Sequence, residues 1–160
     1  MAASPRPLVS DTTAVRPVQL DQVEHLLKLQ KWAQKITSIL DLDELITKIV
    51  DDVAAAFHCV EATIYLHDEE HGELEMAGVH GCTLHDKGSR LKVGKEGMVG
   101  YVASTGQMRY APDVRKDPYY IACEEAALSE VAIPLLVDGR LVGVFAASHH
   151  ELDAFTREHL

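Results

Sequence analysis

The sequence predicts an α+β domain with a mostly antiparallel sheet and with its helices segregated to one side of that sheet. Helical patterns come first, several short β-rich runs come next, and the clearest strand pattern is a hairpin near the end of the sequence. The length of 160 residues suits one domain, and 47% of the residues are apolar, so a largely aliphatic core can form.

Composition excludes several classes of function. The net charge of −10 leaves no basic stripe for nucleic acid. No apolar run approaches the roughly 20 residues that cross a bilayer, so we expect no membrane partner. Residues 1–18 are rich in proline, serine and threonine and are expected to form a disordered tail. The three cysteines, Cys59, Cys82 and Cys123, are widely spaced and fit a reducing, cytoplasmic environment.

A first helix is predicted over about residues 20–40. Its apolar residues recur at alternating spacings of three and four, which is the a/d repeat of a coiled-coil seam over about two heptads. We therefore expect a homodimer through this helix. The seam consists of Leu26, Leu29, Ala33, Ile36 and Leu40.

A second helix is predicted to begin at Asp41, with Glu44 completing a capping box. The apolar stripe within 45–57 supports that helix. The period then changes to two. Residues 61–66 and 73–79 are β-rich runs around a polar turn, and together they predict a hairpin.

The middle of the sequence is predicted to alternate short strands with short helices. Residues 91–93 and 108–111 are strand candidates, and the glycine-framed residues 94–106 between them favour a short helix. Residues 113–120 are predicted to form a loop, because they include a proline. A brief helix is expected over 121–127.

The strongest local signal is a hairpin over 131–137 and 140–147, joined by Asp138-Gly139. Both arms are almost continuously apolar, which predicts central strands. Thr156 then suits the cap of a further helix, which stops at Leu160 after about one turn. We therefore expect the natural polypeptide to continue.

Four segments, in order and spacing, resemble the GAF domain family over roughly residues 22–160. They are GKEGMVGYVASTG (94–106), APDVRKDPYY (111–120), SEVAIPLLVDGRLVGVFAAS (129–148) and AFT (154–156). The resemblance implies a six-stranded antiparallel sheet with the terminal helices on one face. It places a small-molecule pocket on the other face, in a domain of residues 19–160 whose C-terminal helix is truncated.

The resemblance also implies a sensory role as the N-terminal part of a larger regulatory protein. The terminal helices would form the dimer and transmit the signal to an output domain such as a histidine kinase, diguanylate cyclase or PP2C-type phosphatase. The alternative is that the tyrosines fill the pocket and leave a ligand-free dimerisation scaffold. The implied pocket residues are Tyr65, Tyr101, Tyr110, Asp113, Tyr119, Tyr120, Cys123 and Glu130.

A second alternative is enzymatic. Residues 120–124, with Cys123, and the later Glu130 are similar to the active site of the free methionine sulfoxide reductases, which are GAF proteins. The companion cysteine of that site is expected near Val99 and is absent there, and Cys82 lies too far upstream to align with it. Reduction by thiols needs an attacking and a resolving sulfur. On this ground we expect no catalytic residues and a chain that is not an enzyme.

Other ligands are disfavoured. The cyclic-nucleotide class of GAF domains carries a signature that begins with asparagine and lysine, and this sequence contains no asparagine. Three histidine and cysteine pairings are conceivable metal or haem ligands: His58-Cys59, His80 with Cys82, and His149-His150. Neighbours in a strand point to opposite faces, and two ligands fall short of the four of a structural zinc site. We therefore expect no metal and no cofactor.

Overall fold

The computed structural model describes residues 20–123 and 126–155, except for the side chains of residues 20–23, 39 and 40. The predicted tail over 1–18 and the helix expected from Thr156 lie outside the described residues. Within the described parts the elements are α1 (Leu20–Phe57), β1 (Glu61–Asp68), β2 (Glu73–His80), β3 (Arg90–Lys92), α2 (Gly97–Thr105), β4 (Arg109–Ala111), the 3-10 helix η1 (Val114–Lys116), β5 (Ser129–Val137) and β6 (Arg140–His149).

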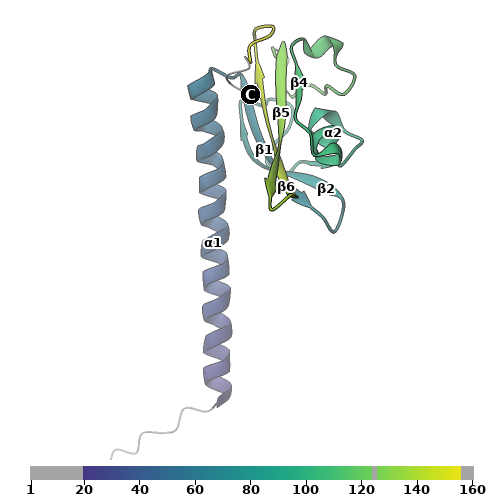
Figure 1. The fold of residues 1–160 in the computed structure, drawn as a ribbon. Coiled ribbons are helices and arrows are strands. Elements are labelled where there is room, and N and C mark those ends of the chain that lie inside the picture. Colours follow the sequence, from purple (N-terminus) through teal and green to yellow (C-terminus); the bar gives the residue numbers. More distant parts are fainter. Residues whose placement is uncertain (1–19, 124–125, 156–160) are drawn as a thin grey trace, which may run out of the picture. The chain divides into compact units, whose positions relative to one another are not determined.

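The strands form one six-stranded sheet in the order β3-β2-β1-β6-β5-β4 (Figure 1). Every neighbouring pair is antiparallel, which confirms the predicted fold class. The hairpin of β5 and β6 turns at Asp138 and Gly139, whose φ angles are 51° and 77°. Two successive positive φ angles are what a two-residue turn of type I′ requires, and the Asp-Gly pair adopts them at low cost.

The sheet has a buried core on each of its faces, and β1 contributes to both, because successive side chains of a strand point to opposite faces. Ala62 and Ile64 belong to the buried cluster that contains Val50 of α1. Tyr65 belongs to the other cluster, with Met98 of α2. Helix α2 therefore covers the face opposite to the one on which the last turns of α1 pack, as the resemblance implies.

Helix α1 corrects one predicted boundary. A new helix was expected at Asp41, but α1 is continuous from Leu20 to Phe57. No glycine or proline interrupts residues 36–45, so nothing in the backbone there requires a break. The brief helix expected over 121–127 is also wrong for its described residues, which form no helix.

Four of the five predicted seam residues lie on the N-terminal part of α1, which belongs to a separate compact unit that ends at Ser38, and Leu40 lies beyond that boundary. Leu26, Leu29 and Ile36 are 63%, 55% and 55% exposed. Ala33 is exposed as well, and the side chain of Leu40 is outside the description. Dimerisation through this seam stays a prediction.

Candidate functional site

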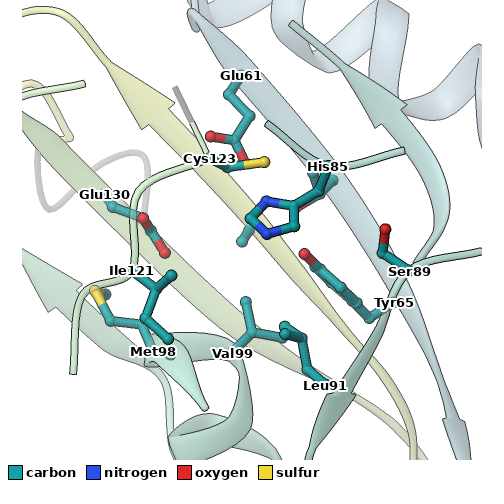
Figure 2. A pocket seen from close by; sticks show the side chains of 13 residues that line it. Glu61, Tyr65, His85, Ser89, Leu91, Met98, Val99, Ile121, Cys123 and Glu130 are labelled. Carbon is teal, nitrogen blue, oxygen red and sulfur yellow. The ribbon is translucent and has the colours of Figure 1, made fainter. Parts of the chain in front are cut away.

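A small pocket lies on the α2 face of the sheet (Figure 2). Its volume is about 40 Å³, which is room for ordered water or the functional group of a small ligand. Strands β1, β5 and β6 form its floor, and α2, the segment from β2 to β3 and the segment before β5 enclose it. The lining residues are Glu61, Thr63, Tyr65, His85, Ser89, Leu91, Gly97, Met98, Val99, Ile121, Cys123, Glu130 and Ala146.

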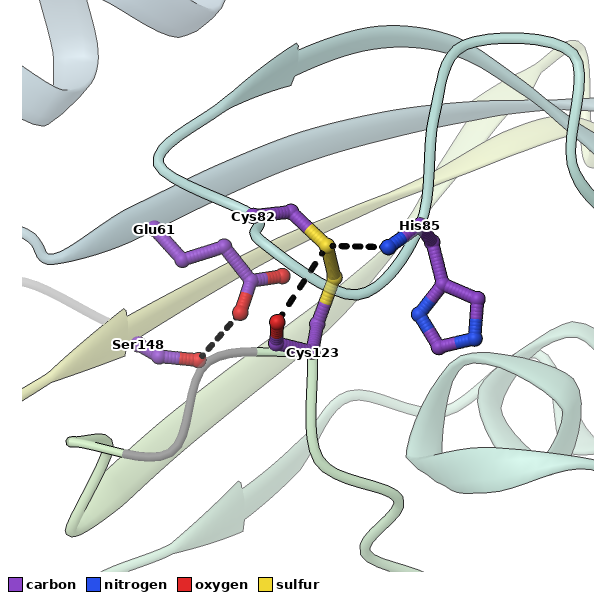
Figure 3. Close-up of a disulfide and its surroundings, with 5 residues drawn as sticks. All are labelled: Glu61, Cys82, His85, Cys123 and Ser148. Atoms are coloured by element: carbon purple, nitrogen blue, oxygen red, sulfur yellow. Dashed lines mark hydrogen bonds between the residues drawn. A yellow bond between two sulfur atoms is a disulfide. The ribbon is translucent and has the colours of Figure 1, made fainter.

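A disulfide joins Cys82 and Cys123 at the edge of this pocket (Figure 3). Their Cα atoms are 5.3 Å apart, within the range for bridged cysteines, although 41 positions separate them in the sequence. Main-chain bonds hold the two segments together as well, because the amides of Thr83 and Leu84 donate to the Cys123 carbonyl at 3.2 and 3.3 Å. Cys82 was expected not to align with the companion cysteine of the reductases, so Cys123 was expected to have no resolving partner; the structure supplies Cys82 as a partner in a different segment.

Two glutamates bring buried carboxyl groups to the same pocket. Glu61 and Glu130 are 6% and 8% exposed. Burial, with the nearby Glu61 charge as a second cause, raises the pKa of Glu130 well above its ordinary value of 4.5. The Ser148 hydroxyl donates to the Glu61 carboxylate at 3.5 Å. The pocket therefore holds a carboxyl group that stays protonated to higher pH than an exposed glutamate.

Two further groups give the pocket hydrogen-bonding capacity. The Thr63 hydroxyl is the one buried side-chain polar atom without a hydrogen-bond partner in the described part of the chain, and Thr63 is 1% exposed. A buried unpaired hydroxyl costs free energy, which a ligand or a water in the pocket can recover. Burial raises the pKa of Tyr65 above its ordinary value, so its hydroxyl stays neutral and can donate.

Of the eight predicted pocket residues, the structure brings Tyr65, Cys123 and Glu130 into the lining. Glu61, Thr63, His85 and Ser89 were missed. The signal for two of them was available in the sequence, because Glu61 and Thr63 alternate with Tyr65 along one strand and so share its face. His85 and Ser89 lie in the segment between β2 and β3, where no periodic pattern in the sequence indicates which way a side chain points.

The remaining predicted residues lie elsewhere. Tyr101 and Tyr119 contact the Arg109 guanidinium, whose carbon lies 4.8 and 4.7 Å from the two ring centroids. Arg109 also forms an ion pair with Asp117 at 2.7 Å, so the two rings and this carboxylate together compensate the charge of the guanidinium.

Tyr110 donates to Asp153 at 2.8 Å. Asp113 accepts from the Arg115 amide at the start of η1 and pairs with its side chain, which holds the pKa of Asp113 below its ordinary value. Tyr120 packs against the α2-side cluster but does not line the pocket.

The histidine pairings suggested by the sequence do not form metal sites in the described residues. His80 pairs with Asp51 at 2.7 Å rather than with Cys82. The rings of His149 and His150 stack with centroids 4.5 Å apart, so the expectation that they point to opposite faces is wrong. The His149 ring instead accepts a hydrogen bond from the Glu151 amide at 3.0 Å.

The GAF domain family matches residues 39–160, which include the sheet, the covering helix α2 and the pocket. The chain belongs to the GAF domain family. Protein YtsP of Bacillus subtilis is 34% identical over 86 residues, which are 52% of this chain and 48% of that protein. The GAF domain of an Acinetobacter phosphoenolpyruvate-protein phosphotransferase superposes with a TM-score of 0.67 at 21% identity, over 84% of this chain and 82% of the other.

Several of the similar proteins are enzymes. The free methionine-R-sulfoxide reductase of Neisseria meningitidis, solved in complex with its substrate, has a TM-score of 0.65 at 27% identity, over 75% of this chain and 71% of that chain. The corresponding Saccharomyces cerevisiae reductase is 40% identical over 55 residues, 34% of this chain and 30% of that protein. The expectation that this chain is not an enzyme is contradicted by these similarities.

The GAF chain spans about a quarter to about half the length of the first curated relatives it matches. In the described part of the chain, neither helix combines the length and the apolar character that crossing a membrane requires.

Replacing Glu130 with glutamine should change how stability depends on pH. A buried carboxyl with a raised pKa binds its proton more tightly in the folded chain, so the free energy of unfolding falls as pH rises from about 4.5 through the folded pKa. The Glu130→Gln variant has no such proton to lose, so its melting temperature should exceed that of the native chain by a widening margin up to pH 8. The exposed Glu70→Gln is the control and should follow the native curve. A constant margin between pH 5 and pH 8 would contradict the raised pKa.

Proposed function

We propose that this GAF domain is a regulatory sensor that binds a small molecule with an amine or similar donor group in the pocket beneath α2. The observation that carries the proposal is the pair of buried glutamates, Glu61 and Glu130, in one pocket with the unpaired Thr63 hydroxyl. Buried carboxylates are costly unless a donor or a cation compensates them. A ligand ammonium group would supply hydrogen bonds, and its positive charge would lower the raised pKa of Glu130, so that this carboxyl group ionises as the ligand binds.

The sensor would act as a cytoplasmic homodimer. The exposed apolar seam of α1 supports this, because Leu26, Leu29 and Ile36 leave a hydrophobic stripe for a partner copy. Ligand binding would favour one arrangement of the dimer helices, provided the ligand has different affinities for the two arrangements. An output domain in the same polypeptide, such as a histidine kinase, diguanylate cyclase or PP2C-type phosphatase, would read the change.

A second candidate function is reduction of free methionine-R-sulfoxide, which the Cys82–Cys123 pair specifically favours. With both cysteines reduced, the Cys123 thiolate would attack the sulfoxide sulfur. As one proton is taken up, the substrate S–O bond and the transient bond between the two sulfurs break, the oxygen ends on the Cys123 sulfur as a sulfenic acid, and the substrate leaves as a thioether. Cys82 then attacks the sulfenic sulfur, which releases water and forms the disulfide. An external dithiol reduces the disulfide again. Glu130 lines the pocket and has a raised pKa, which supports a role in supplying the proton that the transferred oxygen needs.

Both candidate functions begin with the same binding event. A free amino acid carries an ammonium group, which suits the glutamates, and methionine sulfoxide adds an oxidised sulfur, which suits the cysteine pair. The two candidates differ in the fate of the bound molecule: the sensor releases its ligand unchanged, and the reductase releases a thioether.

The sensor proposal predicts selective stabilisation by free amines. In a thermal shift assay, a binding amino acid at about a hundred times its Kd should stabilise the chain by about 2.7 kcal/mol, and its N-acetyl derivative should not. Glu130→Gln should remove the shift, and the exposed Glu70→Gln should retain it. Equal shifts from an amine and its N-acetyl derivative, or no shift from any free amine in a metabolite library, would refute amine recognition.

The reductase candidate predicts turnover that depends on two cysteines out of three. With dithiothreitol as reductant, thioether formation from free methionine-R-sulfoxide should fall about a hundredfold or more in Cys123→Ser. It should fall less in Cys82→Ser, because dithiothreitol can itself attack the Cys123 sulfenic acid, but that variant should form no disulfide at Cys123 when substrate is added without reductant. Cys59→Ser is the control, because Cys59 is buried in the cluster on the other face of the sheet. An inactive native chain, or an active Cys123→Ser, rules out this candidate and leaves the sensor.

A further inference from the structure

We infer that reduction of the Cys82–Cys123 disulfide creates a zinc site in which these two cysteines and His85 are the ligands. One ligand atom from each residue, the two sulfurs and a ring nitrogen, lie within 4.8 Å of one another. Figure 3 shows the His85 ring beside the two sulfurs. The inference rests on a reducible cysteine pair, which the reductase candidate shares, but it requires neither amine binding nor sulfoxide turnover.

The local backbone already gathers the three ligands. Cys82 and His85 are separated by two residues in one loop, a spacing that lets one loop offer two ligands to a metal. The His85 amide donates to the Cys82 sulfur at 3.3 Å, which folds this loop around the sulfur. Cys123 comes from a different segment, but its carbonyl accepts from Thr83 and Leu84 between the other two ligands. The arrangement therefore does not depend on the disulfide alone.

The spacing of the ligand atoms suits a tetrahedral ion after a small movement. Zinc binds sulfur at about 2.3 Å and imidazole nitrogen at about 2.0–2.1 Å, so ligand atoms of one site are about 3.5–3.8 Å apart. The atoms of the trio lie within 4.8 Å of one another, and the two sulfurs must separate when their bond is reduced. Side-chain rotations of this size need no change in the sheet.

The chemistry of the ligands favours zinc over harder ions. Two thiolates and an imidazole are soft and borderline donors, which select zinc rather than magnesium or calcium. Two thiolates also neutralise the charge of the ion, so the complex carries no net charge and can form at a buried ligand such as Cys123, which is 8% exposed. Three protein ligands leave a fourth position, and the pocket that His85 and Cys123 line is where it can open.

Metal binding and the disulfide exclude one another, because the ion requires thiolates. An external dithiol gives two electrons and two protons to the disulfide and is itself oxidised to a disulfide. The two protein thiols then lose two protons as they bind one Zn²⁺. An external disulfide can accept two electrons from the two zinc-bound thiolates and, with two protons, become two thiols. The Cys82–Cys123 bond then forms again and Zn²⁺ is released, so the site would hold zinc only when the cysteine pair is reduced.

The test is metal titration of the reduced and the oxidised full chain. Co²⁺ is the spectroscopic probe, and displacement with Zn²⁺ under anaerobic conditions comes second. The reduced chain should bind one equivalent, with a near-ultraviolet sulfur-to-cobalt charge-transfer band and the visible bands of a tetrahedral ion. The disulfide form should show neither. The absence of a one-equivalent thiolate spectrum in the reduced chain would overturn the inference.

Matched variants identify the ligands. His85→Ala should weaken Zn²⁺ binding about tenfold or more, as expected for the loss of one ligand. Cys82→Ser and Cys123→Ser should each abolish the charge-transfer spectrum of the one-to-one complex. The controls are His71→Ala, whose ring pairs with Asp68 at an exposed turn, and Cys59→Ser; both should bind as the native chain does. Native affinity in His85→Ala, or loss of binding in Cys59→Ser, would overturn the assignment.

These metal titrations, combined with the amine-binding and sulfoxide-turnover assays, distinguish failure of this inference from failure of the proposed functions. A reduced chain that binds Zn²⁺ through the trio, but neither responds to amines nor turns over sulfoxide, keeps the zinc site and removes both proposed functions. A chain that turns over sulfoxide but binds no metal when reduced removes the zinc site and leaves the reductase candidate intact.

Discussion

The alternation of side chains along β1 is the constraint on which the fold and the pocket both depend. Ala62 and Ile64 pack on the face that carries the last turns of α1, and Thr63 and Tyr65 face α2. Both edges of β1 are paired, because it lies between β2 and β6, and a buried cluster covers each of its faces. A shift of one residue in the register of β1 would place Thr63 in the core beside α1 and would remove the polar floor of the pocket.

The pocket concentrates groups that are costly to bury. Glu61, Glu130 and the Thr63 hydroxyl lie beneath a rim that holds two cysteines and a histidine. An apolar side chain at any of these positions would stabilise the domain more simply, so their joint presence at one cavity is better explained by a ligand or a reaction than by folding. The proposed ligand binding, thiol chemistry and metal binding would all use this one place, which would make the redox state of the cysteine pair the variable that connects them.

Sequence reasoning predicted the features that depend on local pattern. The Asp138-Gly139 hairpin, the β-rich run over 61–66 and the glycine-framed helix each appear in the structure, because each is determined by neighbours within a few positions. The meeting of Cys82 and Cys123 depends on loop closure over 41 positions, which no local spacing encodes.

The site was predicted less completely than the fold, for a related reason. Tyr101 and Tyr119 were expected in the pocket as aromatic walls, but Arg109 draws both rings to a separate cluster. Whether an aromatic ring lines the cavity or packs on a nearby cation depends on distances in the folded chain, which local sequence patterns do not encode. In contrast, Glu130 does line the pocket, because its position in a strand next to the centre of the sheet is determined by the hairpin register.

Disulfide mapping of the air-oxidised full chain tests the central claim, that Cys82 and Cys123 meet at the pocket. The chain would be denatured, alkylated without reduction, digested and analysed by mass spectrometry. We expect one linked species that joins the Cys82 and Cys123 peptides, lighter by two hydrogens than their sum, together with alkylated Cys59. Alkylation of all three cysteines, or a link that includes Cys59, would contradict the account.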